Sequence, residues 1–149
     1  MSYRLTVAAL ILTAACATQP NKAGITDPQI DIAQEVGPAD LNFPVGPVEF
    51  KFDYRITNQW SQPMTVIRIA VSTSNPEGGA YSLRHDMYNV RETIPPGESR
   101  IVSFWAKGYS YGRSMRESEP VTLHTVVYFE TPAGTYQKVL IREIPQRSI

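Results

Sequence analysis

The sequence predicts an all-β fold, a single antiparallel β-sandwich of about seven strands. The first observation is the strict alternation of apolar and polar residues over 48–57, which is typical of a strand with one buried face. The second is that turn signals rich in Pro, Gly and Asn recur at short intervals along the chain. The third is that no segment after the N-terminal stretch keeps helical spacing, so strands have to build the core.

The other strands follow from these turns. In 64–73 the apolar phase switches between Val66 and Ile67, which predicts either a β-bulge or a strand that is covered on both faces. Pro95 and Gly97 separate the strands on either side of them, because proline cannot donate to a central ladder. In order, the further strands are expected at 29–36, 64–73, 81–94 (two short strands), 100–107, 120–131 and 135–144, the last two joined as a hairpin.

The N-terminal stretch follows a different pattern. Arg4 gives it a positive start, and 5–12 is apolar apart from Thr6. This apolar run is too short to span a bilayer, but it has the length of a signal-peptide core. Small residues and a lone cysteine follow, in the order Leu12-Thr13-Ala14-Ala15-Cys16. We therefore expect residues 1–15 to be a signal peptide.

This arrangement resembles the lipobox of bacterial lipoproteins. In that family the residue at the place of Cys16 is acylated, with chains such as palmitate, and becomes the N-terminus that anchors the protein. The resemblance implies that Cys16 is a lipidation site and that the protein is held in the bacterial cell envelope. Thr13 departs from the pattern, since the family favours Leu there and Leu12 lies one place earlier. Ala17 in place of an Asp implies the outer membrane, facing the periplasm, in a cell that has one.

Two other interpretations of this stretch stay open. Ordinary signal peptidase could read 13–15 or 15–17 as its small-residue motif, which would release a soluble periplasmic or secreted protein. Alternatively, the stretch could be a buried N-terminal helix of a cytosolic protein. After it, 16–28 is polar and is expected to form the lipidated N-terminus and a flexible tether. The β-sandwich domain is expected at 29–145, with a short tail at 146–149.

Composition excludes several classes of function. The 149 residues suit one domain, and 14 Lys and Arg balance 14 Asp and Glu. This balance lacks the basic footprint of a protein that binds nucleic acid, so no nucleic-acid partner is expected. There is no run of eighteen or more apolar residues for a transmembrane helix. No nucleotide-binding fingerprint occurs, and no cofactor is expected.

Three segments resemble those of immunoglobulin-like and fibronectin type III-like modules: "FDYRITN", "QPMTVIRIAV" and "IPPGESRIVSFWA". In such modules a strand that ends in Thr-Asn precedes a turn, and a Pro-Gly turn precedes a strand of the opposite sheet. The resemblance covers about 48–144 and implies an immunoglobulin-like sandwich. The Cys…Trp…Cys pattern of antibody domains is absent. A fold resemblance of this kind implies no activity.

One motif suggests chemistry. Ser110 lies in a G-x-S-x-G pattern, and Glu117 or Glu119 and then His124 follow in the order of a hydrolase triad. The helix that such a nucleophile needs behind it is not predicted, so the pattern favours a Gly-rich loop between strands. The only two histidines, His85 and His124, lie far apart in sequence, and no metal site is expected.

The connection 107–120 is the candidate interaction loop. It carries residue types that are enriched at protein interfaces, namely Tyr109, Tyr111, Arg113, Met115 and Arg116. The alternative is a long hairpin loop whose tyrosines cover the edge of the sandwich.

The leading hypothesis is a non-catalytic lipoprotein that presents its sandwich for protein interaction or envelope assembly, with a membrane anchor and an envelope protein as partners. The alternatives are a Ser110-dependent hydrolase and a small-ligand carrier. The carrier would have a pocket between the sheets lined by Phe50, Phe52, Tyr54, Phe104 and Phe129.

Overall fold

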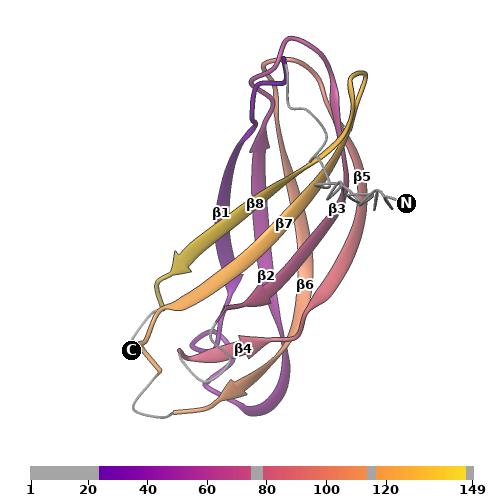
Figure 1. Cartoon of the computed structure of the whole chain (residues 1–149). Helices are drawn as coiled ribbons and strands as arrows, with labels where there is room; N and C mark the ends of the chain where they lie inside the picture. Colours follow the sequence, from indigo (N-terminus) through magenta and orange to yellow (C-terminus); the bar gives the residue numbers. More distant parts are fainter. Residues whose placement is uncertain (1–23, 75–78, 114–116, 147–149) are drawn as a thin grey trace, which may run out of the picture.

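The computed structural model describes residues 24–74, 79–113 and 117–146, and they form two antiparallel sheets that face each other (Figure 1). The prediction of an all-β sandwich is confirmed, with eight strands in these residues rather than about seven. The strands are β1 (Gln29–Val36), β2 (Val45–Thr57), β3 (Met64–Thr73), β4 (Tyr81–Leu83), β5 (Asp86–Ile94), β6 (Ser99–Tyr111), β7 (Val121–Thr131) and β8 (Gly134–Ile144).

Each sheet has four strands. The first has the order β1-β2-β6-β4, and the second has the order β5-β3-β7-β8. The chain changes sheets at every connection from β2 to β7. Because neighbours in a sheet come from distant parts of the sequence, neither sheet is complete until most of the chain has folded.

The core lies between the sheets and contains many aromatic rings. The alternation expected for β2 is confirmed, since Phe50, Phe52, Tyr54 and Ile56 are completely buried. The ring of Phe50 stacks on that of Tyr81 in β4, with 4.1 Å between the ring centroids. This contact between β2 and β4 stabilises the short strand β4 in its sheet.

The bulge expected in β3 is confirmed. Its pairing with both neighbours, β5 and β7, shifts register between Val66 and Arg68. The weakly patterned segment 81–94 does contain two strands, β4 and β5. The irregular hydrophobic pattern reflects an irregular ladder in β3, and in 81–94 it reflects a chain that passes from one sheet to the other.

Strand β2 begins earlier than the sequence suggests. The alternating pattern begins only at Val48, and prolines stand before it at 44 and 47, yet β2 starts at Val45 and pairs with β6 from there on. Pro47 is tolerated because the Pro47–Tyr109 pair exchanges no hydrogen bonds, so its nitrogen points to the other side of β2. Strand β1 is absent on that side, since its last paired residue, Val36, lies opposite Lys51.

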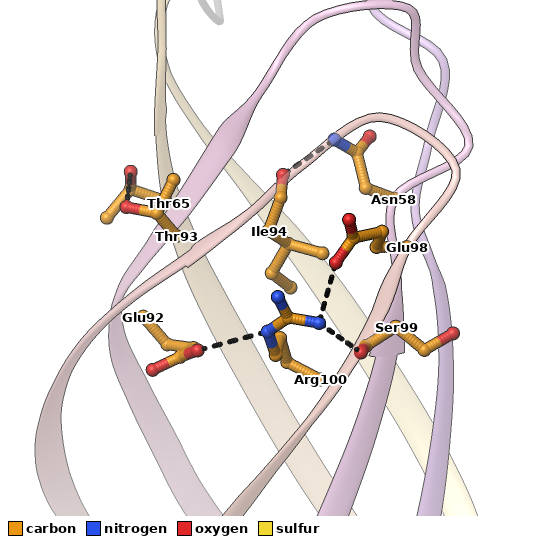
Figure 2. A network of polar contacts seen from close by, with 8 residues as sticks. All are labelled: Asn58, Thr65, Glu92, Thr93, Ile94, Glu98, Ser99 and Arg100. Carbon is orange, nitrogen blue, oxygen red and sulfur yellow. Dashed lines mark hydrogen bonds and ion pairs between the residues drawn. The ribbon is translucent and has the colours of Figure 1, made fainter.

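One end of the sandwich is held by a buried asparagine (Figure 2). The side-chain amide of Asn58 donates to the carbonyl oxygens of Ile94 (2.9 Å) and Gln62 (2.8 Å). Its side-chain oxygen accepts a hydrogen bond from the Trp60 N–H at 2.9 Å. The turn after β2 and the turn before β6 are therefore fixed to each other. The described residues contain no helix that is long and apolar enough to cross a membrane.

Candidate binding surface

Tyr109 and Tyr111 lie on strand β6, which corrects the prediction of a loop over 107–120. The strand continues to Tyr111 because β2 pairs with it as far as the Val45–Tyr111 pair. Strand β4 pairs with it on the other side, from Gly108 to Ser110. A Cβ at Gly108 would lie 2.5 Å from the Ser82 carbonyl oxygen, so glycine permits this close approach. The Gly-rich sequence predicted a loop here, whereas Gly108 lies in a strand and allows β4 to pack close to β6.

The other predicted interface residues are not all brought together. Arg113 follows β6, and its guanidinium lies over the ring of Phe43 at 5.5 Å from the ring centroid. This is a cation–π contact within the chain. Met115, Arg116 and the predicted lipidation site Cys16 lie outside the described residues.

A line of large exposed side chains runs along the outer face of β6. We call it the aromatic strip, and it consists of Ile101, Trp105, Tyr109 and Tyr111, which are 54%, 49%, 44% and 37% exposed. These residues face outward because the even-numbered positions between them point into the core. The rings of Tyr109 and Tyr111 lie 5.6 Å apart, and the Tyr111 hydroxyl donates to Ser82 Oγ at 3.1 Å.

Ile101 and Trp105 are not among the site residues predicted from the sequence. The sequence does contain a pattern that marks them, because both alternate with Val102, Phe104 and Ala106 and therefore lie on the opposite face of β6. A strand whose second face also carries large apolar residues has either two buried faces or an exposed binding face. Only the packing of the sheets shows which of the two applies.

Charged side chains flank the strip on the neighbouring strands. Across the sheet, Arg55 lies opposite Ile101, Asp53 opposite Ser103, and Lys51 opposite Trp105. Beyond Ile101 the surface forms a shallow hollow of about 160 Å³, lined by Asp31, Ile32, Ala33, Glu35, Asp53, Arg55 and Ile101. In this hollow Asp53 Oδ1 is buried, and no hydrogen-bond partner for it exists among the described residues.

Ser110 and His124 are not assembled into a catalytic pair. Ser110 is completely buried on β6, and its Oγ accepts a hydrogen bond from the Gly112 N–H at 3.3 Å. His124 lies on β7 in the other sheet and alternates with the buried Leu123 and Thr125, so its side chain points away from the core. The G-x-S-x-G match is therefore part of a strand, with its serine turned inward.

The aromatic residues suggested as a ligand pocket pack against one another instead. Phe50, Phe52, Tyr54 and Phe129 are completely buried, and Phe104 lies 5.1 Å from the ring of Tyr54. They form part of one core cluster that joins both sheets. Among the described residues, no three His, Cys, Asp or Glu side chains converge in a way that could hold a metal ion.

The fold and this surface define an antiparallel β-sandwich protein with an aromatic outer face. No family model matches the chain, and no curated protein matches its sequence. The fold is similar to that of a protein from Archaeoglobus fulgidus, with a TM-score of 0.50 and 13% identity, over 81% of this chain and 97% of that one.

Two other solved structures are similar at lower scores. One is the structural-genomics target SoR45, with a TM-score of 0.48 and 9% identity, over 79% of this chain and 84% of that one. The other is a Bordetella pertussis protein described as ApaA, with a TM-score of 0.43 and 16% identity, over 80% of this chain and 92% of that one. At such low identity the likeness to the Archaeoglobus protein concerns the fold alone.

Proposed function

We propose that the protein is a non-catalytic binding module, anchored in the bacterial cell envelope through lipid on Cys16, that recognises a protein partner through the aromatic strip. The observation that carries the proposal is the exposure of Ile101, Trp105 and Tyr109 along one strand. A soluble domain gains nothing in stability from holding large rings in water, and such rings are typical of interface centres.

Two arguments support a binding role over catalysis. The only sequence motif for a nucleophile places Ser110 in the core, away from His124. The exposed strip, in contrast, lies on strand β6, which is paired with β2 along its whole length, and a surface held in this way loses little conformational entropy when it binds.

The anchor is supported by the sequence before the sandwich. A charged start, a short apolar run and a lone cysteine at its end together match a lipoprotein signal. Several acyl chains would hold the protein firmly, since each buried methylene contributes about 0.8 kcal/mol. The polar residues 17–28 would then act as a tether between the membrane and β1.

The anchor is tested by the intact mass of the protein extracted from host membranes. The expected mass is that of a chain beginning at Cys16 plus acyl chains, and Cys16→Ser should move the protein to the soluble fraction without acylation. An unacylated wild-type mass in the soluble fraction would refute the anchor and leave a secreted or periplasmic binding module.

The binding surface is tested separately by crosslinking in the native host. A photoreactive amino acid at Tyr109 should give a discrete crosslinked product, while the same amino acid at Ile141 serves as the matched control. Ile141 is an exposed apolar residue at 61% on β8 of the opposite sheet. Crosslinking at Ile141 alone, or equal products at both positions, would count against the aromatic strip.

A further inference from the structure

The aromatic strip runs beside an open stretch of strand edge. Strand β6 pairs with β2 along its whole length, but on its other side β4 pairs only with residues from Gly108 to Ser110. From Ile101 to Trp105 no described strand is hydrogen-bonded to β6 on that side, although Tyr88 of β5 in the other sheet stacks on Phe104 at 4.3 Å between the ring centroids. Strand β6 is thus a central strand at one end and an edge strand at the other.

The backbone groups at this open edge can be identified from the ladder. In an antiparallel pair, successive residues point their N–H and C=O groups to alternate sides. The Glu98 carbonyl accepts from Asn58, on the β2 side, and the Lys107 carbonyl accepts from Arg84, on the β4 side. Odd-numbered residues of β6 therefore point to the open side. Ile101, Ser103 and Trp105 have N–H and C=O groups there with no ladder partner among the described residues.

Both ends of this open stretch are closed. At one end the guanidinium of Arg100 donates to the Ser99 carbonyl oxygen at 3.1 Å and forms ion pairs with Glu98 and Glu92 (Figure 2). At the other end Arg84 N–H donates to the Lys107 carbonyl oxygen at 3.1 Å. We call this open stretch, from Ile101 to Trp105, the slot, and it has the length of an extended segment of about five residues.

The slot lacks the protection that the edges of β5, β1 and β8 have. Strand β5 is interrupted by Arg91 at a φ of 63°, where its pairing with β3 skips residues. The edges of β1 and β8 are linked by Lys138, which donates to the Pro28 carbonyl oxygen at 2.8 Å. The segment 101–105, "IVSFW", has no charge, proline or glycine and consists mainly of strand-forming residues. Such a segment pairs readily with an added strand.

We propose that the slot from Ile101 to Trp105 binds an extended peptide segment of a partner protein as an added β-strand. This inference rests on the proposed function and specifies how the partner is held. Backbone hydrogen bonds to Ile101, Ser103 and Trp105 bind any extended segment, and side chains give specificity. The partner's residues beside Ile101 and Trp105 on the outer face are apolar or aromatic, and they pack on the strip.

A second copy of this chain does not fit the slot in the symmetric register centred on Ser103. An antiparallel copy of β6 centred on Ser103 would place its own Ser99 opposite Lys107. Arg84 already occupies that position through its hydrogen bond to Lys107. A short peptide avoids this collision because its ends can leave the slot between Arg100 and Arg84.

The test uses a displayed library of random nine-residue peptides, selected on the whole chain carrying Cys16→Ser. The selected peptides should alternate apolar and variable positions. They should bind Ser103→Pro about tenfold or more weakly than wild type. This proline removes one N–H from the slot but none from the ladder with β2. The matched control Ser103→Thr keeps the N–H and should bind as wild type does.

Amide hydrogen exchange by NMR shows where a selected peptide binds, and it does not depend on any variant folding. In the free protein the amides of Ile101, Ser103 and Trp105 should exchange faster than those of Val102 and Phe104, which face β2. The peptide should protect the three odd-numbered amides selectively. Protection elsewhere, or no enriched peptide, would overturn the proposal.

Two further outcomes would also overturn it. Protection of the three amides that grows with protein concentration, together with a dimer in sedimentation, would identify a second copy as the occupant. Protection at every concentration in the free monomer would show that the chain covers its own slot. If Tyr109 crosslinks to a partner while the three amides stay unprotected, the proposed function stands and strand addition alone fails.

Discussion

Asn58 shows how one buried polar side chain can organise an end of the sandwich. It is completely buried, and its side chain makes hydrogen bonds with three backbone groups, on Trp60, Gln62 and Ile94. Its backbone adds two more, because its N–H donates to the Glu98 carbonyl and its carbonyl accepts from Gly97. A buried polar group is stabilising only when it is satisfied in this way.

Asn58→Ala should lower the free energy of unfolding by roughly 2–4 kcal/mol, because it leaves buried backbone groups without partners. Urea unfolding measures this loss. Asn89→Ala is the matched control, since Asn89 is exposed and makes one long contact with Arg68, at 3.3 Å; its effect should stay within about 0.5 kcal/mol. Equal effects of the two variants would contradict the role given to Asn58.

The buried tyrosines make stability depend on alkaline pH. Burial raises the pKa of the Tyr54 hydroxyl above its usual value of 10.0, although a hydrogen bond with Thr125 at 2.9 Å lowers the pKa in part. Burial likewise raises the pKa of Tyr81 in the stack with Phe50. Both hydroxyls stay protonated in the folded protein at pH values where the unfolded chain loses these protons.

The stabilising effect of each buried tyrosine is therefore complete below about pH 10 and is lost as the pH rises towards the folded-state pKa. Each should reduce the free energy of unfolding by about 1.4 kcal/mol per pH unit in that range. Urea unfolding at several pH values between about 8 and 11 measures the slope. Tyr54→Phe should make it shallower, and an unchanged slope in that variant would contradict the prediction.

At the scale of elements, β6 combines three environments in one strand. Its inner face packs the core, its outer face carries the aromatic strip, and β4 covers only its C-terminal end. This arrangement depends on the close contact between Gly108 and β4. A Cβ at Gly108 would meet Ser82, Phe50 and Leu83 at 3.0 Å or less.

Gly108→Ala should therefore push β4 away from β6 and lower the free energy of unfolding by about 1–3 kcal/mol. Thermal or urea unfolding measures the loss, and the near-ultraviolet circular dichroism of the Phe50–Tyr81 stack should weaken. Ser103→Ala on the exposed face of the same strand is the control and should change stability little. A stable Gly108→Ala protein with an unchanged aromatic signal would show that β4 adjusts without cost.

At the scale of the whole molecule, the sheets share one core and cannot separate. The chain changes sheets at every connection from β2 to β7, and a single cluster of buried residues joins both sheets. A cooperative transition is expected for one domain of this kind. The sandwich should therefore unfold as a unit, even though β4 and the open edge of β6 are its least paired parts.

Two probes should report one unfolding midpoint. Trp60 is 9% exposed and Trp105 is 49% exposed, so Trp105→Phe leaves Trp60 as a single buried fluorophore. Its fluorescence should change at the same urea concentration as the far-ultraviolet circular dichroism of all the strands. Phe129→Leu in the second sheet should shift both midpoints together. Separate midpoints would mean that the sheets unfold independently.

The sequence by itself determined the fold class and the strand positions within a few residues, and it indicated an irregularity in β3 for which a bulge was one of two interpretations. These follow from local rules, since alternation reports a half-buried strand and a phase switch reports an irregular ladder. It also supplied the candidate anchor, Cys16, as a local motif. Proline and glycine are typical of strand ends and loops, yet Pro47 lies within β2 and Gly108 lies within β6. At both positions, pairing with neighbouring strands outweighs the local preference of the residue.

Only the tertiary structure decided which faces and edges are exposed. In the sequence, Ile101 and Trp105 are apolar strand residues whether their face is covered or open. Alternation is a property of a single strand, whereas exposure depends on which other elements pack against it. Ser110 likewise matches a nucleophile motif in the sequence, and only the structure shows that its side chain is buried in the core. The open edge of β6 exists because β4 is short and pairs only beyond Lys107, and strand order of this kind comes from long-range pairing, which local sequence does not encode.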